Sequence, residues 1–212
     1  MCIGAAPEVE TFRGGGIDTE HVFSADNKQA CMKFWQDNYP EVFKHQFYDV
    51  TEMAEMDTAK CTKCFGLCVC TMAIMCLDVL IAGFSCKPYS TARTGRHSEG
   101  TTKHKDVKVL HAVLRWIVLC QPKCCILENV FGFAVPESET CTETPLQRLL
   151  ADLRVLVPQY VVSIIVAAGD TFMSWRRRRL YIVLHHEAIG GAGAAARMQR
   201  MIKDIFINYN FA

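Results

Sequence analysis

The sequence feature that most constrains the fold is a short apolar run that ends in glycine and leads to a cysteine. Val79–Ala82 is apolar, Gly83 ends the run, and Cys86 follows in the tight loop Phe84–Pro88. An apolar run of this length that ends at glycine is typical of a buried parallel strand. Because open α/β sheets place their chemistry just beyond the carboxyl ends of such strands, the pattern predicts a nucleophilic role for Cys86. The alternative is a buried thiol that packs as a small hydrophobe.

A second apolar run with a polar end follows later in the chain. Cys124–Leu127 leads directly to Glu128 and Asn129, in the string CCILENV. Together, GFSCKPYS and LENV resemble the two catalytic signatures of the cytosine-C5 DNA methyltransferases, which are usually a Pro-Cys dipeptide and Glu-Asn-Val. The order and spacing of the pair carry the resemblance, because either motif alone is only weakly specific.

The resemblance implies an α/β fold of the Rossmann-like, S-adenosylmethionine-dependent methyltransferase type. Its sheet would be mostly parallel, with helices on both faces, and the fold would be incomplete at both ends. The resemblance covers residues 12–184, so a catalytic domain is expected over residues 1–186 and a tail with a short helix over residues 187–212. In the family, a target-recognition domain would begin here, and we expect this sequence to lack it.

The resemblance also implies the roles of the catalytic residues. Cys86 would add as a thiolate to carbon 6 of cytosine, which makes carbon 5 able to accept a methyl group. Glu128 would place a proton or hydrogen bond on ring nitrogen 3, and Arg179 would assist near the carbonyl oxygen of the base. The residues expected to contact the substrate are Ser85, Asn129 and Arg177.

An arginine run precedes an expected strand near the C-terminus. In the string WRRRRLYIV, Arg176–Arg179 lead into the strand Leu180–Leu184. The string resembles the family's Gln-x-Arg-x-Arg block, with Trp175 in place of the glutamine and with Arg177 and Arg179 on the matching arginines. Without the resemblance, such a run is a solvated surface or a phosphate-binding patch.

Two residues beside Cys86 depart from the family's pattern. Ser85 stands where the family has proline, a residue that would restrict the turn. Lys87 stands where glutamine is usual, and a cation beside a thiol favours its thiolate form.

The first part of the chain contains the residues that the resemblance assigns to the cofactor, S-adenosylmethionine. The string FRGGG matches the family's Phe-x-Gly-x-Gly, which implies cofactor-binding roles for Phe12, Gly14 and Gly16. A glycine-rich turn is the alternative, and the strand and helix that flank this loop in the family are not evident. Asp26 and Asp49 are the acids expected at strand ends to bind the ribose and the adenine. For both, the alternative is an aspartate that bonds turn backbone.

Periodicity predicts several elements between these motifs. Apolar side chains share one helical face over Asn27–Asn38 and over Asp106–Leu119. The string TPLQ, which begins at Thr144, resembles a capping box with proline at the first helical position. Tyr160–Ala167 is rich in β-branched residues and predicts a strand.

The segment Lys60–Cys76 is rich in cysteine, and we expect it to form an apolar helix or loop. Its alternative is a zinc site that begins at Cys61 and Cys64, although the spacings to Cys68 and Cys70 are tight and no histidine lies nearby. We therefore expect no metal.

Composition limits the class of protein and its partners. A chain of 212 residues that is 50% hydrophobic suits one α/β domain, and its net charge of +1 does not by itself predict a polyanionic partner. Contact with nucleic acid would come from local clusters, such as the loop Thr91–Lys105, whose alternative is a solvated linker. The twelve cysteines, without a signal peptide, predict reduced thiols and an intracellular location, the nucleus in a eukaryote or the cytoplasm in a prokaryote. No apolar run is long enough to span a membrane.

The expected function is therefore methyl transfer from S-adenosylmethionine to carbon 5 of a flipped-out cytosine in DNA. Two alternatives stay open. One is methylation of cytosine in RNA, since the family includes members that act on tRNA. The other is an inactive remnant that only binds cofactor, nucleic acid or a partner protein. A companion chain that supplies target recognition is a further partner that the sequence leaves open.

Overall fold

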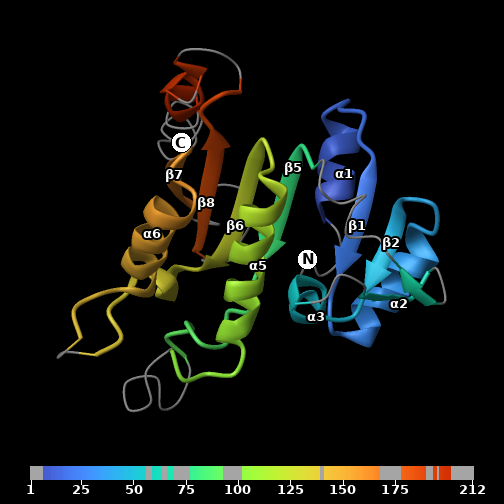
Figure 1. The fold of residues 1–212 in the computed structure, drawn as a ribbon, viewed down its shortest axis with the longest axis horizontal. Coiled ribbons are helices and arrows are strands. Elements are labelled where there is room, and N and C mark those ends of the chain that lie inside the picture. Colours follow the sequence, from blue (N-terminus) through green and yellow to red (C-terminus); the bar gives the residue numbers. More distant parts are fainter. Residues whose placement is uncertain are drawn as a thin grey trace. The chain divides into compact units, whose positions relative to one another are not determined.

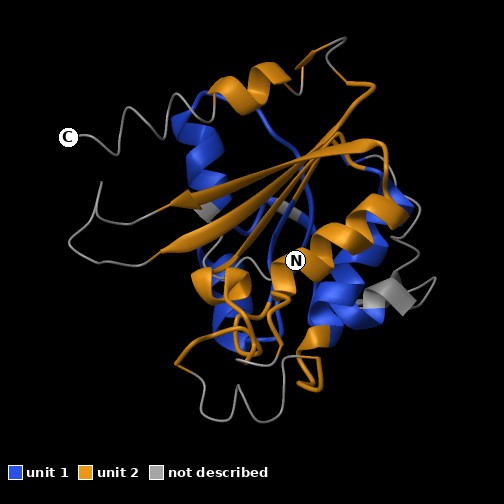
Figure 2. Cartoon of the chain, turned by 90° about the vertical axis from the view of Figure 1, so that its left-hand side faces the viewer, with its two compact units in different colours: residues 1–77, 81–84, 108–121 blue, residues 78–80, 85–107, 122–212 orange. Residues whose placement is uncertain are grey.

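The structure of the chain is a computed structural model (Figure 1). It describes residues 7–55, 59–63, 66–68, 77–92, 102–138, 141–167, 178–189, 193–194 and 196–201. The chain divides into two compact units (Figure 2). Unit 1 comprises residues 1–77, 81–84 and 108–121, and unit 2 comprises residues 78–80, 85–107 and 122–212.

Unit 1 contains a four-stranded sheet with the strand order β1-β2-β3-β4. Its elements are α1 (Pro7–Gly14), β1 (His21–Ala25), α2 (Gln29–Asn38), β2 (Phe43–Phe47), α3 (Val50–Glu55), β3 (Ala59–Cys61), β4 (Gly66–Cys68) and nearly all of α5 (Val107–Cys120). Strands β1 and β2 pair in parallel, with Ala25 opposite Phe47. The pairs β2–β3 and β3–β4 are antiparallel.

Aromatic and sulfur-containing side chains form the core of unit 1. Trp35 and Met32 of α2 are buried and pack with Val9 of α1. The ring of Phe23 on β1 lies 6.4 Å from that of Phe47 and 5.8 Å from that of Trp116. These contacts fix the parallel strand pair, and with it the position of the residues that follow each strand.

Unit 2 contains a second sheet, with the strand order β5-β6-β8-β7. Its elements are β5 (Val79–Gly83), in which the boundary between the units falls, β6 (Cys124–Val130), the short 3₁₀ helix η2 (Phe131–Ala134), α6 (Pro145–Leu156), β7 (Tyr160–Ala167) and β8 (Arg179–His186). Strand β8 lies between β6 and β7 and runs antiparallel to both. The buried side chains of β6 and β8, among them Leu127 and Ile182, form the centre of this sheet.

The fold agrees with the predicted α/β class, and the strands predicted at β5, β6 and β7 are confirmed. The pairing is more mixed than the mostly parallel sheet that we expected, because β8 inserts antiparallel between two strands that precede it in the chain. Helix α2 begins at Gln29, and in the turn before it the N–H of Lys28 donates to Asp26 Oδ1.

The prediction of an apolar helix or loop over Lys60–Cys76 is wrong for its described part. Residues Ala59–Cys61 and Gly66–Cys68 form the short antiparallel strands β3 and β4, and Cys61 pairs with Phe47 of β2. The backbone groups at the edge of β2 therefore decided the conformation of this segment rather than its local apolar character. Residues Cys64, Cys70 and Cys76 lie outside the described residues.

The predicted capping box at the start of α6 is confirmed. The N–H of Gln147 donates to Thr144 Oγ1 at 3.1 Å, and the N–H of Thr144 donates to Gln147 Oε1 at 2.7 Å. Leu149 and Leu153 then bury the apolar face of the helix.

In the tail, residues 196–201 are helical, and the N–H of Arg197 donates to the carbonyl of Gly193. This agrees with the predicted short helix, while the boundary proposed at residue 186 stays a prediction.

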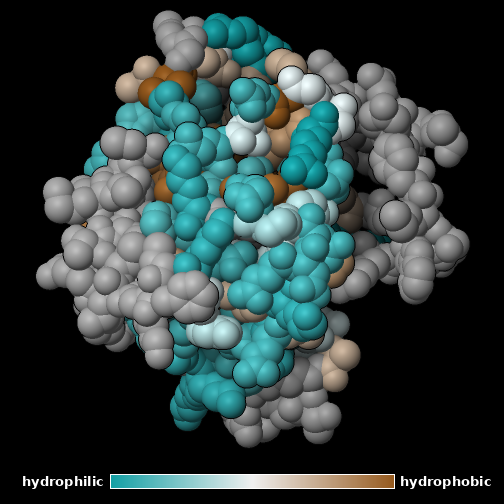
Figure 3. Space-filling view, turned by 90° about the vertical axis from the view of Figure 1, so that its right-hand side faces the viewer, coloured by the Kyte–Doolittle hydropathy of each residue, from teal (hydrophilic) through white to brown (hydrophobic). Residues whose placement is uncertain are grey.

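The face drawn in Figure 3 is mostly hydrophilic among its coloured residues. No helix among the described residues combines the length and the apolar character that a membrane span requires.

Candidate active site

Cys86 lies just beyond β5, in a loop that backbone hydrogen bonds close into a turn. The carbonyl oxygen of Cys86 accepts from the N–H groups of Tyr89 at 3.0 Å and Ser90 at 2.9 Å. The side chains of Cys86 and Lys87 are exposed, whereas Pro88 and Tyr89 are buried. The thiol is therefore not packed as a small hydrophobe, which was the alternative to a reactive cysteine.

Asp106 contacts both neighbours of Cys86. The hydroxyl of Ser85 donates to Asp106 Oδ2 at 3.0 Å, and the Lys87 ammonium nitrogen lies 3.9 Å from the same oxygen. Because the Lys87 side chain is 72% exposed, this ion pair contributes at most about 1 kcal/mol. A hydrogen bond to a charged acceptor contributes about 1.5–3 kcal/mol, so the bond from Ser85 is the stronger restraint. Sequence reasoning missed Asp106 because 21 positions separate it from Ser85.

The far side of the cysteine loop is anchored by an aromatic contact. The Tyr89 ring, which is 3% exposed, packs edge-on against Phe133 of η2 with the ring centroids 4.6 Å apart. Burial raises the pKa of Tyr89 to about 12, although the positive charge of Arg148 acts in the opposite direction. Because η2 directly follows β6, this contact ties the loop of Cys86 to the segment after Glu128.

Glu128 and Arg179 form an ion pair across two neighbouring strands. Glu128 lies opposite Tyr181, so Arg179 occupies the diagonal position on the same face of the sheet. Arg179 Nε is 2.7 Å from Glu128 Oε1, and the Glu128 side chain is 34% exposed. Burial raises the pKa of Tyr181, and the negative charge of Glu128 raises it further. The structure thus brings together two of the three predicted catalytic residues and leaves the carboxyl accessible to a ligand.

The three predicted substrate-contacting residues have different surroundings. Ser85 donates to Asp106, as described above. Asn129 is 1% exposed and its Oδ1 accepts from the N–H of Val130, so its side chain supports the strand end from within the core. Arg177 lies outside the described residues. Its neighbour Arg178, which sequence reasoning did not single out, holds its guanidinium 5.5 Å from the centre of the Phe131 ring.

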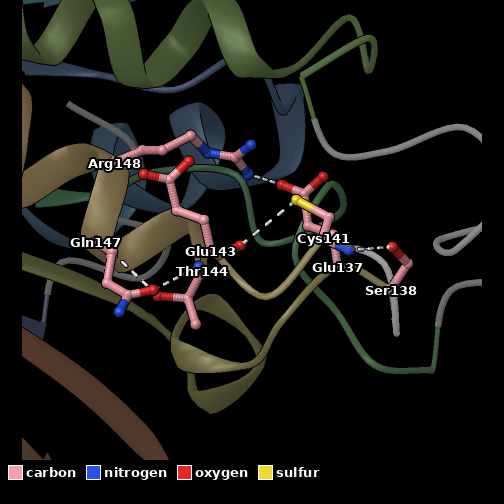
Figure 4. Close-up of polar contacts among 7 residues, drawn as sticks. All are labelled: Glu137, Ser138, Cys141, Glu143, Thr144, Gln147 and Arg148. Carbon is pink, nitrogen blue, oxygen red and sulfur yellow. Dashed lines mark hydrogen bonds and ion pairs between the residues drawn. The ribbon is translucent and has the colours of Figure 1, made fainter.

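A buried ion pair fixes the segment that follows η2 (Figure 4). Glu137 is 6% exposed and pairs with Arg148 of α6. The N–H of Cys141 donates to Ser138 Oγ in the same segment, and the capping box of α6 follows. Together these contacts hold α6 against the segment that carries Phe133, the packing partner of Tyr89.

In unit 1, the two acids predicted to bind the cofactor lie at the carboxyl ends of neighbouring parallel strands. The N–H of Asp26 donates to the carbonyl of Phe47 at 3.2 Å, and Asp49 follows two residues after Phe47. One oxygen of each carboxylate is used in a local turn. Asp26 Oδ1 accepts from the N–H of Lys28, and Asp49 Oδ1 accepts from both the N–H and the hydroxyl of Thr51. The turn interpretation is therefore correct for both residues, and a role in cofactor binding stays a prediction.

The resemblance implied that the glycine run connects a strand to a helix, but the structure does not show this connection. Phe12 and Gly14 belong to the last turn of α1, and Gly16 has a φ of +66° just beyond it. The N–H of Gly16 donates to the carbonyl of Arg13, and the N–H of Ile17 donates to the carbonyl of Phe12. This pair of bonds is the Schellman motif that ends helices at a glycine. The conformation of the glycine run is therefore determined locally, by the hydrogen bonds that end α1.

These observations test whether the residues of unit 1 fit S-adenosylmethionine. Two carboxylates at the ends of neighbouring strands suit the hydroxyls of a ribose and the amino group of an adenine, so the chemistry of Asp26 and Asp49 fits this part of the molecule. The glycine run does not fit its amino-acid part, because the N–H groups of Gly15, Gly16 and Ile17 already donate within the helix end. At Gly14, an added Cβ would meet no atom within 4 Å among the described residues, so no close approach requires glycine there.

The alternative of a zinc site at Cys61 and Cys64 falls largely outside the described residues, among which no three His, Cys, Asp or Glu side chains gather. Cys61 Sγ instead lies 3.9 Å from His45 Nδ1.

Solved methyltransferases share this fold. The methyltransferase EhMeth of Entamoeba histolytica matches with a TM-score of 0.57 and 17% identity, over 87% of this chain and 51% of that chain. The Dnmt2 methyltransferase of S. pombe matches with a TM-score of 0.57 and 17% identity, over 90% of this chain and 50% of that one. The fold is therefore that of a methyltransferase, and the chain spans about half the length of these proteins.

The family follows from the sequence itself. The profile of the C-5 cytosine-specific DNA methylases matches residues 10–201, a range that contains Cys86, Glu128 and Arg179. The chain belongs to this family. The match extends beyond residue 184, where we expected the resemblance to end. No curated protein sequence matches the chain.

Proposed function

We propose that the chain methylates carbon 5 of cytosine in DNA, with S-adenosylmethionine as the methyl donor. The observation that carries the proposal lies within unit 2. An exposed cysteine follows β5, and the neighbouring strand β6 carries, near its end, the carboxyl of Glu128, which Arg179 holds in place. Membership of the cytosine-C5 family supports the assignment of these groups to this reaction.

In the proposed reaction, the Cys86 sulfur forms a bond to carbon 6 of the flipped-out base. The electron pair of the carbon 5–carbon 6 bond then becomes available at carbon 5. Glu128 places a proton or hydrogen bond on ring nitrogen 3, which limits the build-up of negative charge there, and Arg179 orients Glu128. S-adenosylmethionine, when bound, supplies the methyl group, and Asp26 and Asp49 are the residues that would hold it. Loss of the carbon 5 proton lets Cys86 leave and restores the aromatic ring.

The test is transfer of a labelled methyl group to duplex DNA that contains cytosine. We expect Cys86→Ala to abolish transfer and Glu128→Gln to lower it by about 100-fold, the lower part of the range for loss of a general acid. Cys141→Ala is the matched control, because it removes a thiol from the same unit outside the site. Transfer that persists in Cys86→Ala would reject the mechanism. Single-stranded RNA and tRNA substrates in the same assay separate the DNA reaction from cytosine methylation in RNA.

A second candidate is a chain that binds a ligand or partner without catalysis. The helix-ending conformation of the glycine run favours it, because the N–H groups that could hold the cofactor are engaged. Calorimetry with S-adenosylmethionine separates the two candidates. Saturable binding supports the enzyme, and an absence of heat with the folded chain supports the second candidate.

A further inference from the structure

We infer that Asp106 is a positioning residue for the proposed nucleophile. Its carboxylate accepts the hydroxyl of Ser85, the residue directly before Cys86, and thereby fixes the direction in which the thiol is presented. This inference rests on the proposed function for its catalytic meaning, whereas the restraint on the loop can be measured without any methyl transfer.

The Asp106 carboxylate is itself held in place. The N–H of Asp106 donates to His104 Nδ1 at 3.1 Å, and the N–H of Val107 donates to the carbonyl of His104 at 3.0 Å. These two bonds fold the backbone around Asp106, whose side chain is only 20% exposed. A carboxylate on a fixed backbone can orient the group that donates to it, because it loses little further freedom when the bond forms.

Ser85 is the position where such a restraint matters. After Cys86, the chain is already fixed by two N–H bonds to the Cys86 carbonyl and by the packing of Tyr89 on Phe133. Before Cys86, serine leaves the backbone freer than a proline would. The bond from Ser85 to Asp106 supplies a second anchor, so that Cys86 lies between two fixed points.

Lys87 shares the Asp106 carboxylate but contributes little to this restraint. Its ammonium group lies 3.9 Å from the carboxylate, and its side chain is largely in solvent. Asp106→Asn therefore keeps an oxygen that can accept from Ser85 while it removes the charge that faces Lys87. Asp106→Ala removes both. The two substitutions separate the hydrogen bond from the ion pair.

The experiment compares the full chain with Asp106→Ala, Asp106→Asn, Ser85→Ala and the Ser85→Ala/Asp106→Ala double variant. Asp152→Ala is the matched control, because Asp152 is an exposed residue of α6 in the same unit. The first readout is hydrogen exchange at the amides of Tyr89 and Ser90, which bond to the Cys86 carbonyl. The second is the kcat and KM of methyl transfer to DNA.

We expect exchange at these two amides to become about tenfold faster in Asp106→Ala and in Ser85→Ala, as for loss of one hydrogen bond to a charged acceptor. The double variant should be no faster than either single variant, because one bond is lost in all three. Asp106→Asn should lie between the parent and Asp106→Ala, because its neutral oxygen still accepts from Ser85 but more weakly than the carboxylate, and Asp152→Ala should match the parent. In Asp106→Ala and in Ser85→Ala, the kcat of methyl transfer should fall by about tenfold, while the KM for S-adenosylmethionine should stay unchanged.

Unchanged exchange in both Asp106→Ala and Ser85→Ala, or effects that add in the double variant, would overturn the inference. If Asp106→Ala does not fold, Ser85→Ala tests the same bond from its other partner. A parent chain without methyl transfer but with the expected exchange pattern would reject the proposed function and leave the positioning role of Asp106 supported. Methyl transfer that is unaffected in Ser85→Ala would reject the positioning role alone.

Discussion

At the scale of single residues, the surroundings of Cys86 are built by side chains from three separate stretches of unit 2. Ser85 reaches Asp106 before α5, and Tyr89 reaches Phe133 after β6. The exposed thiol thus sits in a loop that has buried contacts on each side. The ionisation of Tyr89 reports on this arrangement, because its pKa is raised to about 12 by burial.

Tyr89 should make the stability of the chain fall in alkaline solution. The unfolded chain releases the Tyr89 proton near its ordinary pKa of 10.0, while the folded chain keeps it up to about 12. The unfolded state therefore binds fewer protons over this window, and the free energy of unfolding decreases as the pH rises. In Tyr89→Phe, we expect this decrease between about pH 10 and about pH 12 to be smaller by about 2 kcal/mol. Urea denaturation at several pH values measures it, with Tyr48→Phe, a more exposed tyrosine, as the control.

At the scale of elements, local hydrogen bonds fix the ends of two helices, one in each unit. The Schellman motif ends α1 at Gly16, and the capping box starts α6 at Thr144. Helix α6 carries Arg148, whose ion pair with Glu137 holds the segment after η2. A weakened start of α6 should therefore loosen this segment as well as the helix.

Thr144→Ala should lower the free energy of unfolding by about 1 kcal/mol, because the N–H of Gln147 loses its acceptor. Thr144→Ser keeps the hydroxyl and should stay within about 0.5 kcal/mol of the parent. Chemical denaturation followed by circular dichroism gives both values. Equal destabilisation by alanine and serine would show that the hydroxyl has no capping role.

At the scale of the whole molecule, the candidate groups divide between the two units. Asp26 and Asp49 belong to unit 1, and Cys86, Glu128 and Arg179 belong to unit 2. The chain also spans about half the length of the solved methyltransferases that share its fold. The proposed binding of S-adenosylmethionine by Asp26 and Asp49 can therefore be tested separately from catalysis.

Two substitutions in unit 1 test whether Asp49 or the glycine run contributes to the binding of S-adenosylmethionine. We expect Asp49→Asn to weaken binding of S-adenosylmethionine by about tenfold, because the amide is a poorer acceptor than the carboxylate. Gly14→Ala should change the affinity by less than about twofold, since its methyl group would meet open space at the end of α1. Calorimetry measures both affinities. A large loss in Gly14→Ala would instead support a cofactor loop at the glycine run.

The sequence by itself determined the features that depend on neighbouring residues in the chain. Apolar runs closed by polar residues predicted β5 and β6, helical periodicity predicted α2 and α5, and the side chains of Thr144 and Gln147 predicted the start of α6. These features form because their hydrogen bonds and buried faces lie within a few residues of each other. The expectation that Asp26 and Asp49 lie at strand ends came from the family resemblance rather than from such local patterns.

Only the tertiary structure decided the contacts between distant stretches. The antiparallel register of β6 and β8 places Arg179 beside Glu128, and the fold of the loop after β5 brings Ser85 to Asp106. Pairing with β2 made β3 a strand. Such contacts depend on which strands pair and in which register. A local pattern does not contain this information, because the free energy of pairing comes from residues far apart in the chain.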